Sequence, residues 1–353
     1  MPKCLRCGAE LPVNDEGMAP VLCDNCAGRA TRRARVGLKT GTMRDRPATT
    51  ALLAINLAVY TAMVLTGAGF WEMNGSALLK WGANFGPMTL SGEYWRLVTA
   101  GFLHGGLLHI AFNMWCLWSL GELSERLFGK WQTFAIYLVT GVGGSLLSIA
   151  SDSNRFEVGA SGAIFGIAGA LLAGVKFGNL TISSGEKRAI TSSMIFFVGI
   201  NFMLGQSSFM GGRVDNMCHL GGFVTGLLIG LPLGAFAQHH KLYQLATVVI
   251  TSLVLAAGLN ELVKNHGSDA LLFRAEIAAQ QGDMAKAITS LEQYTSNHKE
   301  DDKAFIFLGA LYSETNQRDK AVAAFQNALK ANPQSRDAKE ALSELGADQP
   351  GQK

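Results

Sequence analysis

Seven long apolar stretches constrain the fold of this chain more than any other feature of its sequence. They cover residues 49–67, 97–120, 131–150, 159–176, 189–206, 217–237 and 242–261. A helix needs about 20 predominantly apolar residues to cross a bilayer. Within lipid, only helices and closed barrels satisfy their own backbone hydrogen bonds. The sequence therefore predicts an all-α polytopic membrane protein whose membrane domain covers residues 48–262.

The composition agrees with this interpretation. Of 353 residues, 48% are hydrophobic and only 16% are charged, whereas about a quarter is charged in ordinary soluble proteins. The charged residues are concentrated in the first 46 and the last 90 residues. The net charge of +3 therefore gives no indication of a nucleic-acid partner, and none is expected.

A basic linker at residues 29–47 precedes the first apolar stretch. It contains Arg29, Arg32, Arg33, Arg35, Lys39, Arg44 and Arg46, against a single acid, Asp45. Positive charge next to a span favours the cytoplasmic side, and a nucleic-acid-binding arm is the alternative. Seven spans then place the N-terminus in the cytoplasm and the C-terminal region outside. We expect a multi-pass protein of a prokaryotic plasma membrane.

Two pairs of cysteines lie in the first segment, residues 1–28. Cys4 and Cys7 form one CxxC pair, Cys23 and Cys26 form another, and fifteen residues separate the pairs. Four thiolates at this spacing can surround one tetrahedral Zn²⁺ ion. The segment resembles a small zinc ribbon with a structural ion and no open coordination position. Two disulfides or free thiols are the alternatives, and no cofactor is expected for catalysis.

The last segment, residues 268–346, repeats with a period of 34 residues. The corresponding pairs are Phe273 and Phe307, Gly282 and Asn316, Ala287 and Ala321, and Leu291 and Phe325. This period and pattern resemble tetratricopeptide repeats, which stack helical hairpins. We expect two repeats and a final helix that bind a protein partner. A pair of helical hairpins without a binding function is the alternative.

Polar side chains that are rare in lipid occur on three of the apolar stretches. His104, His109 and Asn113 lie on the second, Ser161 opens the fourth, and His219 is near the start of the sixth. Polar groups at membrane depth are functional candidates. His104, His109, Ser161 and His219 lie near the starts of even-numbered spans, which run from outside to inside, and hence at similar depth. A serine and a histidine on separate spans indicate covalent hydrolysis within the membrane.

Small residues at four-residue intervals line the fourth and sixth stretches. The first ladder is Gly162, Gly166, Ala170 and Gly174, and the second is Gly222, Gly226, Gly230 and Gly234. Such ladders allow helix backbones to approach closely. If the two ladders face each other, Ser161 and His219 come within hydrogen-bond reach. Transporter-like packing, with polar residues that only bond across helices, is the alternative.

Four short motifs in order resemble the rhomboid intramembrane proteases. They are Glu93-Tyr94-Trp95-Arg96, His104 with His109 and Asn113, Gly159-Ala160-Ser161-Gly162, and His219 with Gly222 and Gly226. The resemblance covers about residues 49–240 and implies a six-helix core, here followed by a seventh span.

The resemblance also implies roles for individual residues. Ser161 would be the nucleophile and His219 the general base, and His109, Asn113 and the backbone N–H of Ser161 would stabilise the oxyanion. Gly159 and Gly162 would give the backbone freedom and space, and His104 would support water and loop structure. Trp95 and Arg96 would anchor the outer loop. Two positions depart from the family pattern. Phe165 replaces a frequent tyrosine, so that stacking on His219 would be kept but a hydroxyl would be lost, and Cys218 replaces a small residue.

These features together predict a serine endopeptidase that cleaves single-span membrane proteins near the outer leaflet. An inactive rhomboid-like protein that binds transmembrane clients is one alternative. A membrane-anchored scaffold that presents the zinc ribbon and the repeats is the other. Neither alternative requires both Ser161 and His219.

Overall fold

A computed structural model describes residues 3, 8–11, 46–178, 180, 182–206, 214–235 and 241–347. Contacts divide the chain into two units, Met1–Pro47 and Ala48–Lys353, and each is described by itself. In the first unit, Lys3 and Glu10 form an antiparallel bridge, and Gly8 between them has a left-handed backbone, φ +74°. Cys4, Cys7, Cys23 and Cys26 lie outside the described residues, so zinc binding stays a prediction.

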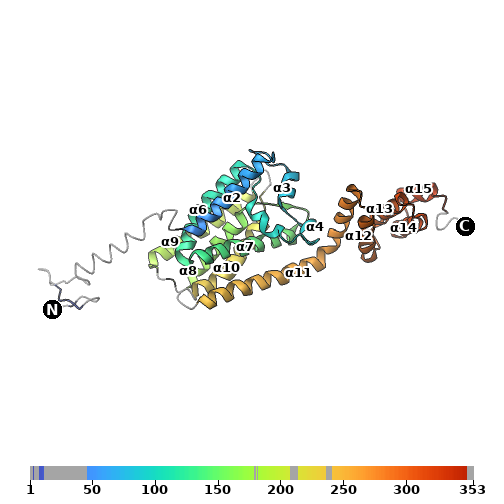
Figure 1. The fold of residues 1–353 in the computed structure, drawn as a ribbon. Coiled ribbons are helices and arrows are strands. Elements are labelled where there is room, and N and C mark those ends of the chain that lie inside the picture. The colour runs from blue at the N-terminus through green and yellow to red at the C-terminus, as the bar shows by residue number, and fades with distance from the viewer. Residues whose placement is uncertain are drawn as a thin grey trace. The chain divides into compact units, whose positions relative to one another are not determined.

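Each expected apolar stretch contains a long helix (Figure 1). These helices are α2 (Pro47–Leu65), α6 (Leu107–Phe128), α7 (Lys130–Ser151), α8 (Ser161–Phe177), α9 (Ser184–Gln206), α10 (Asn216–Ala235) and α11 (Lys241–Gln280). Among the described helices, α2, α7, α10 and residues 242–265 of α11 are long and apolar enough to cross a membrane. A bent pair that ends in α6 is a fifth candidate, and α8 is shorter. The chain is an all-α polytopic membrane protein, and the number of seven crossings stays a prediction.

The second span differs from its expected course. The helical segment α5 (Arg96–Thr99) and the 3₁₀ turn η2 (Ala100–Phe102) precede α6, and the chain bends by 93° between them. Gly106 lies at the bend, where an added Cβ would be 2.2 Å from the carbonyl oxygen of Trp71. This close approach requires glycine, which also favours a break in a helix. His104 therefore lies in the connecting turn rather than on the helix, which corrects the prediction from sequence.

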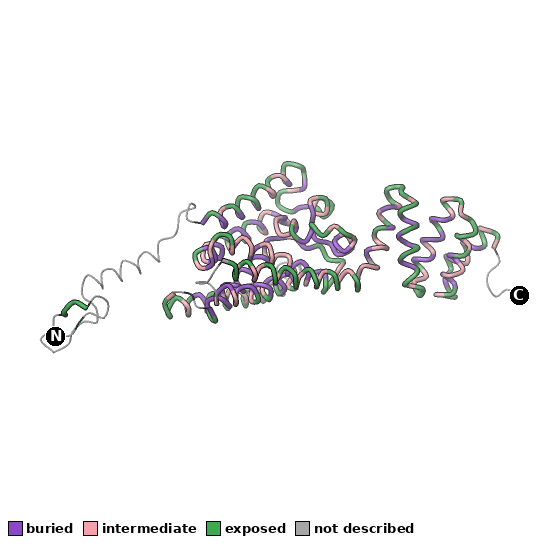
Figure 2. The backbone as a smooth tube through the Cα atoms, turned by 60° about the horizontal axis from the view of Figure 1, so that its bottom comes forward, coloured by how far each residue is buried: buried purple, intermediate pink, exposed green. Residues whose placement is uncertain are grey.

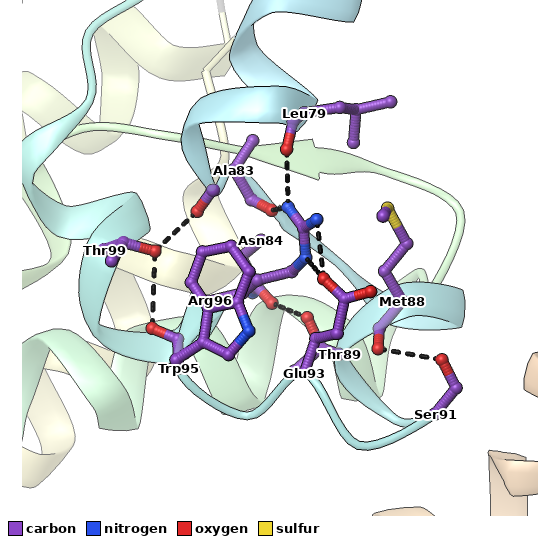
Figure 3. Close-up of polar contacts among 11 residues, drawn as sticks. Leu79, Ala83, Asn84, Met88, Thr89, Ser91, Glu93, Trp95, Arg96 and Thr99 are labelled. Atoms are coloured by element: carbon purple, nitrogen blue, oxygen red, sulfur yellow. Dashed lines mark hydrogen bonds and ion pairs between the residues drawn. The ribbon is translucent and has the colours of Figure 1, made fainter.

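A buried arginine organises the segment between α2 and α6. This segment contains α3 (Gly75–Trp81), β1 (Asn84–Phe85) and α4 (Gly86–Thr89). The guanidinium of Arg96 donates to the carboxylate of Glu93 at 2.8 Å and to the carbonyl groups of Leu79 and Ala83 (Figure 3). It also stacks over the ring of Trp95 at 4.6 Å. The predicted anchoring of this loop by Trp95 and Arg96 is confirmed, and its place outside the membrane stays a prediction.

The strand β1 ties this segment to the residues that precede α8. It pairs antiparallel with β2 (Phe156–Glu157), with Asn84 opposite Glu157 and Phe85 opposite Phe156. The rings of Phe85 and Phe156 lie 4.8 Å apart. This short sheet fixes the chain just before Ser161, because only three residues separate Glu157 from the start of α8.

The two small-residue ladders face each other, which is the arrangement that the sequence analysis considered. A Cβ added at Gly222 would be 2.0 Å from the carbonyl oxygen of Gly162. A Cβ added at Gly226 would be 2.1 Å from the carbonyl oxygen of Gly166. Further along, Gly230 lies against Ala170, and Gly234 against Gly174. The backbones of α8 and α10 therefore touch along their length, and larger side chains would separate them.

Glu125 holds the other end of the membrane core. This carboxylate on α6 accepts the backbone N–H groups of Ala48 at 3.0 Å and Thr49 at 2.9 Å, and the hydroxyl of Thr49 at 2.9 Å. It satisfies two backbone donors of the first turn of α2, which have no partner within the helix. Glu125 is 8% exposed, so α2 is attached to α6 through a buried acid.

The C-terminal helices pack around a core of their own, with buried residues on the facing sides of the helices (Figure 2). After α11 come α12 (Met284–Asn297), α13 (Asp302–Glu314), α14 (Arg318–Ala331) and α15 (Arg336–Glu344). Gly282 and Asn316, 34 residues apart, both adopt left-handed backbones between paired helices, with φ of +80° and +59°. Ala287 and Ala321 are both fully buried. The predicted helical repeat is confirmed.

The last apolar stretch and the first repeat helix form one continuous helix. We expected the membrane domain to end at residue 262 and the repeats to begin at 268, but α11 runs unbroken from Lys241 to Gln280. The connecting residues contain no proline, and an added Cβ at Gly267 would meet its nearest neighbour only at 3.8 Å. Further along α11, the ring of Phe273 packs against Phe85 with centroids 5.3 Å apart.

Candidate active site

Ser161 is the first residue of α8 and comes two residues after a glycine with positive φ. Gly159 has φ +126°, a conformation that favours glycine strongly. A Cβ at Gly159 would lie 2.7 Å from Nε2 of His109 and 3.8 Å from Oγ of Ser161. The imidazole of His109 and the hydroxyl of Ser161 therefore approach the same point, and only glycine leaves the space between them open.

His219 lies in the first turn of α10, which Asp215 caps. The Asp215 carboxylate accepts the backbone N–H groups of Met217 at 3.0 Å and Cys218 at 2.9 Å, and the N–H of His219 donates to the Asp215 carbonyl group. Such capping satisfies the free donors of the first turn. The imidazole stacks on Phe165 with centroids 4.2 Å apart and planes 9° apart. The predicted stacking of Phe165 on His219 is confirmed.

Ser161 and His219 therefore start two helices that touch. The ring of Phe165, one turn after Ser161, stacks on the imidazole of His219. Gly162 lies against Gly222, three residues after His219. In the part of the chain that the structure describes, the two side chains make no hydrogen bond to each other, and Nδ1 of His219 has no partner. Catalytic hydrogen bonds are often long without substrate and tighten in the complex.

His109 is oriented by the turn that precedes α6. Its Nδ1 accepts the backbone N–H of Gly105 at 3.2 Å, so we assign the ring proton to Nε2, which points toward Gly159. The ring of His104 contacts His109 edge to face at 5.2 Å. The Nε2–H group of His109 is thus a donor that points toward Gly159, close to Ser161.

Asn113 follows His109 by one turn on α6. Its side-chain amide donates to the carbonyl group of His109 at 2.9 Å and is buried. One of its two N–H donors is therefore used within the helix. His104, which lies before α6, is fully buried, and both of its ring nitrogens lack a partner.

A buried acid near the site was not identified from the sequence. Glu157 in β2 accepts hydrogen bonds from Asn84, Ser145 and Cys218. Burial raises the pKa of the Glu157 carboxyl group to about 7. The only signal in the sequence was an acid four residues before Ser161, and such an acid is equally typical of a solvated loop. Its burial depends on pairing with Asn84, far away in the sequence.

Comparisons with known proteins show which families this chain resembles. A rhomboid domain matches residues 91–236, and a tetratricopeptide repeat matches residues 278–345. RHOMBOID-like protein 5 of Arabidopsis thaliana is 34% identical over 223 residues, which are 56% of this chain and 70% of that protein. The chain belongs to the rhomboid family. The rhomboid domain contains Ser161, His219, His109 and the other residues of the candidate site outside the cysteine segment.

Two bacterial relatives of this rhomboid carry the word protease in their names. Rhomboid protease AarA of Providencia stuartii is 30% identical over 234 residues, which cover 60% of this chain and 79% of AarA. Rhomboid protease GluP of Bacillus subtilis is 30% identical over 289 residues, 80% of this chain. The chain spans only about half the length of GluP, 54%.

Proposed function

We propose that this rhomboid is an intramembrane serine endopeptidase that uses a Ser161–His219 dyad. The observation that carries the proposal is the close contact between the first turns of α8 and α10, where Phe165 stacks on His219 and His109 approaches Gly159. A nucleophile, a base and an oriented donor at one site are the parts that acyl transfer needs. Two relatives are named as rhomboid proteases.

In the proposed reaction, the Ser161 hydroxyl attacks the carbonyl carbon of the scissile peptide bond as His219 takes its proton. The resulting oxyanion accepts hydrogen bonds from His109 Nε2–H, the backbone N–H of Ser161 and the side-chain amide of Asn113. His219 then gives the proton to the leaving amine, and an ester to Ser161 remains. Water, deprotonated by His219, hydrolyses this ester and restores the serine.

We further propose that the substrates are single-span membrane proteins cleaved near the outer leaflet of a prokaryotic plasma membrane. The N-terminus would be cytoplasmic, with one structural Zn²⁺ held by Cys4, Cys7, Cys23 and Cys26. The repeats would lie outside and bind a protein partner. The contact of Phe273 with Phe85 supports this side, because it joins the first repeat helix to the loop predicted to be outside. A topology reporter fused at residue 268 that is active only in the cytoplasm would contradict it.

Cleavage of a single-span reporter with small residues near its outer end tests the proposed activity. The full chain is compared with Ser161→Ala, His219→Ala and Asn113→Ala in liposomes. Ser161→Ala and His219→Ala should leave the reporter intact. Asn113→Ala should slow cleavage by about 10²-fold without abolishing it, the typical effect of losing one oxyanion donor.

Ser119→Ala is the matched control, because this exposed serine on α6 bonds only to the backbone of its own helix. It should cleave like the wild type. Undiminished cleavage by Ser161→Ala would refute the proposal. A wild type that cleaves no reporter, and that a serine-reactive fluorophosphonate does not label, would favour the alternative of a protein that only binds transmembrane clients.

A further inference from the structure

Two residues that are near neighbours of Ser161 and His219 in sequence touch each other. Glu157 precedes Ser161 by four residues, and Cys218 directly precedes His219. The thiol of Cys218 donates to Oε1 of Glu157 at 3.5 Å. The side chains belong to residues that are 4% and 3% exposed, so the contact is inside the protein. It joins the segment before the proposed nucleophile to the helix turn of the proposed base.

The other carboxylate oxygen of Glu157 joins two further elements. Its Oε2 accepts the side-chain amide of Asn84 at 3.0 Å and the hydroxyl of Ser145 at 2.8 Å. Asn84 belongs to β1, Ser145 to α7, and Cys218 to α10. One side chain therefore connects β1, β2, α7 and α10.

This arrangement is costly, because a buried acid without a cation destabilises a fold. The groups that face Glu157 from β1 and α7 are the neutral Asn84 and Ser145. Cys218 faces it from α10, and the like-charged Asp215 faces it from the residue before α10. Burial and Asp215 both raise the pKa of Glu157. Residues whose burial is unfavourable for stability are expected mainly at functional sites.

Cys218 also packs beside Gly162, the residue that follows the proposed nucleophile. A Cβ at Gly162 would be 2.7 Å from the sulfur of Cys218, so the thiol fills the space between Gly162 and Glu157. The backbone N–H of Gly159 is held in turn by the carbonyl group of Ala100 at 3.0 Å. The position of Cys218 therefore sets the spacing between the start of α8 and the start of α10.

We propose that Glu157 is a positioning residue: its carboxyl group fixes the segment that carries Ser161 against the first turn of α10, which carries His219. The inference rests on the proposed protease function. Glu157 does not take part in the chemistry itself. It acts through Cys218 and the short β1–β2 sheet, which hold the side chains of Ser161 and His219 in position relative to each other.

Labelling of Ser161 by a fluorophosphonate in the detergent-solubilised full chain tests this role. Glu157→Gln keeps the size of the side chain but turns one acceptor into a donor, which then faces other donors. We expect labelling to slow by at least about 10-fold, because small misplacements of reacting groups have large effects on rate. Below about pH 7 the wild-type carboxyl group also becomes protonated and loses acceptor capacity. Part of the wild-type pH dependence should therefore be missing in Glu157→Gln.

Glu125→Gln is the matched control, since Glu125 is a second buried acid with three donors. It lies 16 residues beyond His109 on α6, about 24 Å along the helix. We expect it to lower the thermal midpoint but to keep the labelling rate within about threefold and the pH profile unchanged. Protonation of His219 affects all variants alike, so the comparison isolates Glu157.

Cys218 supplies a second set of variants in case Glu157→Gln does not fold. Cys218→Ser keeps a donor and should label faster than Cys218→Ala. Combined with Glu157→Gln, Cys218→Ala should add little further loss, because residues that act through one contact are not additive.

If the wild type is labelled and Glu157→Gln is labelled at the same rate with the same pH profile, the inference about Glu157 is wrong. The proposed protease function would not be affected by that result. Equal rates for Cys218→Ser and Cys218→Ala would also overturn it. A wild type that neither labels nor cleaves would instead refute the proposed function.

Discussion

Replacing Gly222 by alanine should separate α8 from α10 at the level of Ser161. The new Cβ would lie 2.0 Å from the carbonyl oxygen of Gly162, whereas real Cβ atoms essentially never come closer than 3.0 Å to another atom. The obstacle is backbone, which cannot rotate away. The two helices must therefore move apart by about 1 Å or more, the difference between these distances.

This displacement has two expected consequences. Overpacking of a tight interface costs about 1–3 kcal/mol of stability. A misplacement of about 1 Å between reacting groups can cost 10²-fold in rate. Because Gly162 adjoins Ser161 and Gly222 follows His219 by three residues, we expect Gly222→Ala to lose about 10²-fold in reporter cleavage.

Gly230→Ala is the comparison within the same interface. Its Cβ would be 2.4 Å from the backbone of Ala170, about 12 Å further along α10. It should lower the thermal midpoint as well, but reduce cleavage by less than about 10-fold. Gly258→Ala should keep the wild-type cleavage rate and should not lower the thermal midpoint, since nothing lies within 4 Å of the added atom and alanine favours a helix over glycine.

Cleavage rates in liposomes and thermal midpoints in detergent are measured for all three variants. A Gly222→Ala protein that melts and cleaves like the wild type would refute the close packing of α8 on α10. Equal losses of activity for Gly222→Ala and Gly230→Ala would show that the effect is general destabilisation.

Three further predictions concern other parts of the chain. Arg96→Ala removes the donor to two backbone carbonyl groups. It should lower the free energy of unfolding in detergent by on the order of 3 kcal/mol, the strength expected of hydrogen bonds from a charged group. An unchanged denaturation midpoint would argue against the anchoring role of Arg96. Asn316→Gly should be neutral or slightly stabilising, whereas Asn316→Val should cost more than about 1 kcal/mol by thermal melting, because φ is +59° there and β-branched residues avoid that region. Metal analysis of the purified chain should give about one equivalent of zinc per chain, lost when Cys4 and Cys7 are both replaced by serine, and a metal-free wild type would contradict the predicted site.

The sequence predicted those parts of the fold that depend on short, periodic patterns. The two small-residue ladders have the four-residue spacing of a helix face, so their contact could be anticipated from residues such as Gly162 and Gly222. The 34-residue period likewise paired Gly282 with Asn316, and both residues lie in turns between helices. Patterns of this kind are repeated several times along a helix or a repeat, and each repetition strengthens the prediction.

The features that the sequence did not reveal depend on single contacts between distant segments. His104 was expected on a helix, because the apolar stretch continues through it, but the approach of Trp71 to Gly106 breaks the helix there. Glu157 was overlooked because its burial requires Asn84, 73 residues earlier. The continuity of α11 was missed because Gly267 and the polar residues around it resemble a domain boundary.

The unbroken course of α11 makes its length as important as its sequence. One inserted residue turns everything beyond it by about 100° around the helix axis and advances it by 1.5 Å. Phe273 would then point away from Phe85, and the whole stack of repeats would rotate with it. Seven residues, close to two full turns, would restore the orientation but shift the repeats by about 10 Å along the axis. Substitutions between the last apolar stretch and the repeats should therefore be tolerated far better than insertions or deletions, because the length of the helix sets the orientation of the repeats.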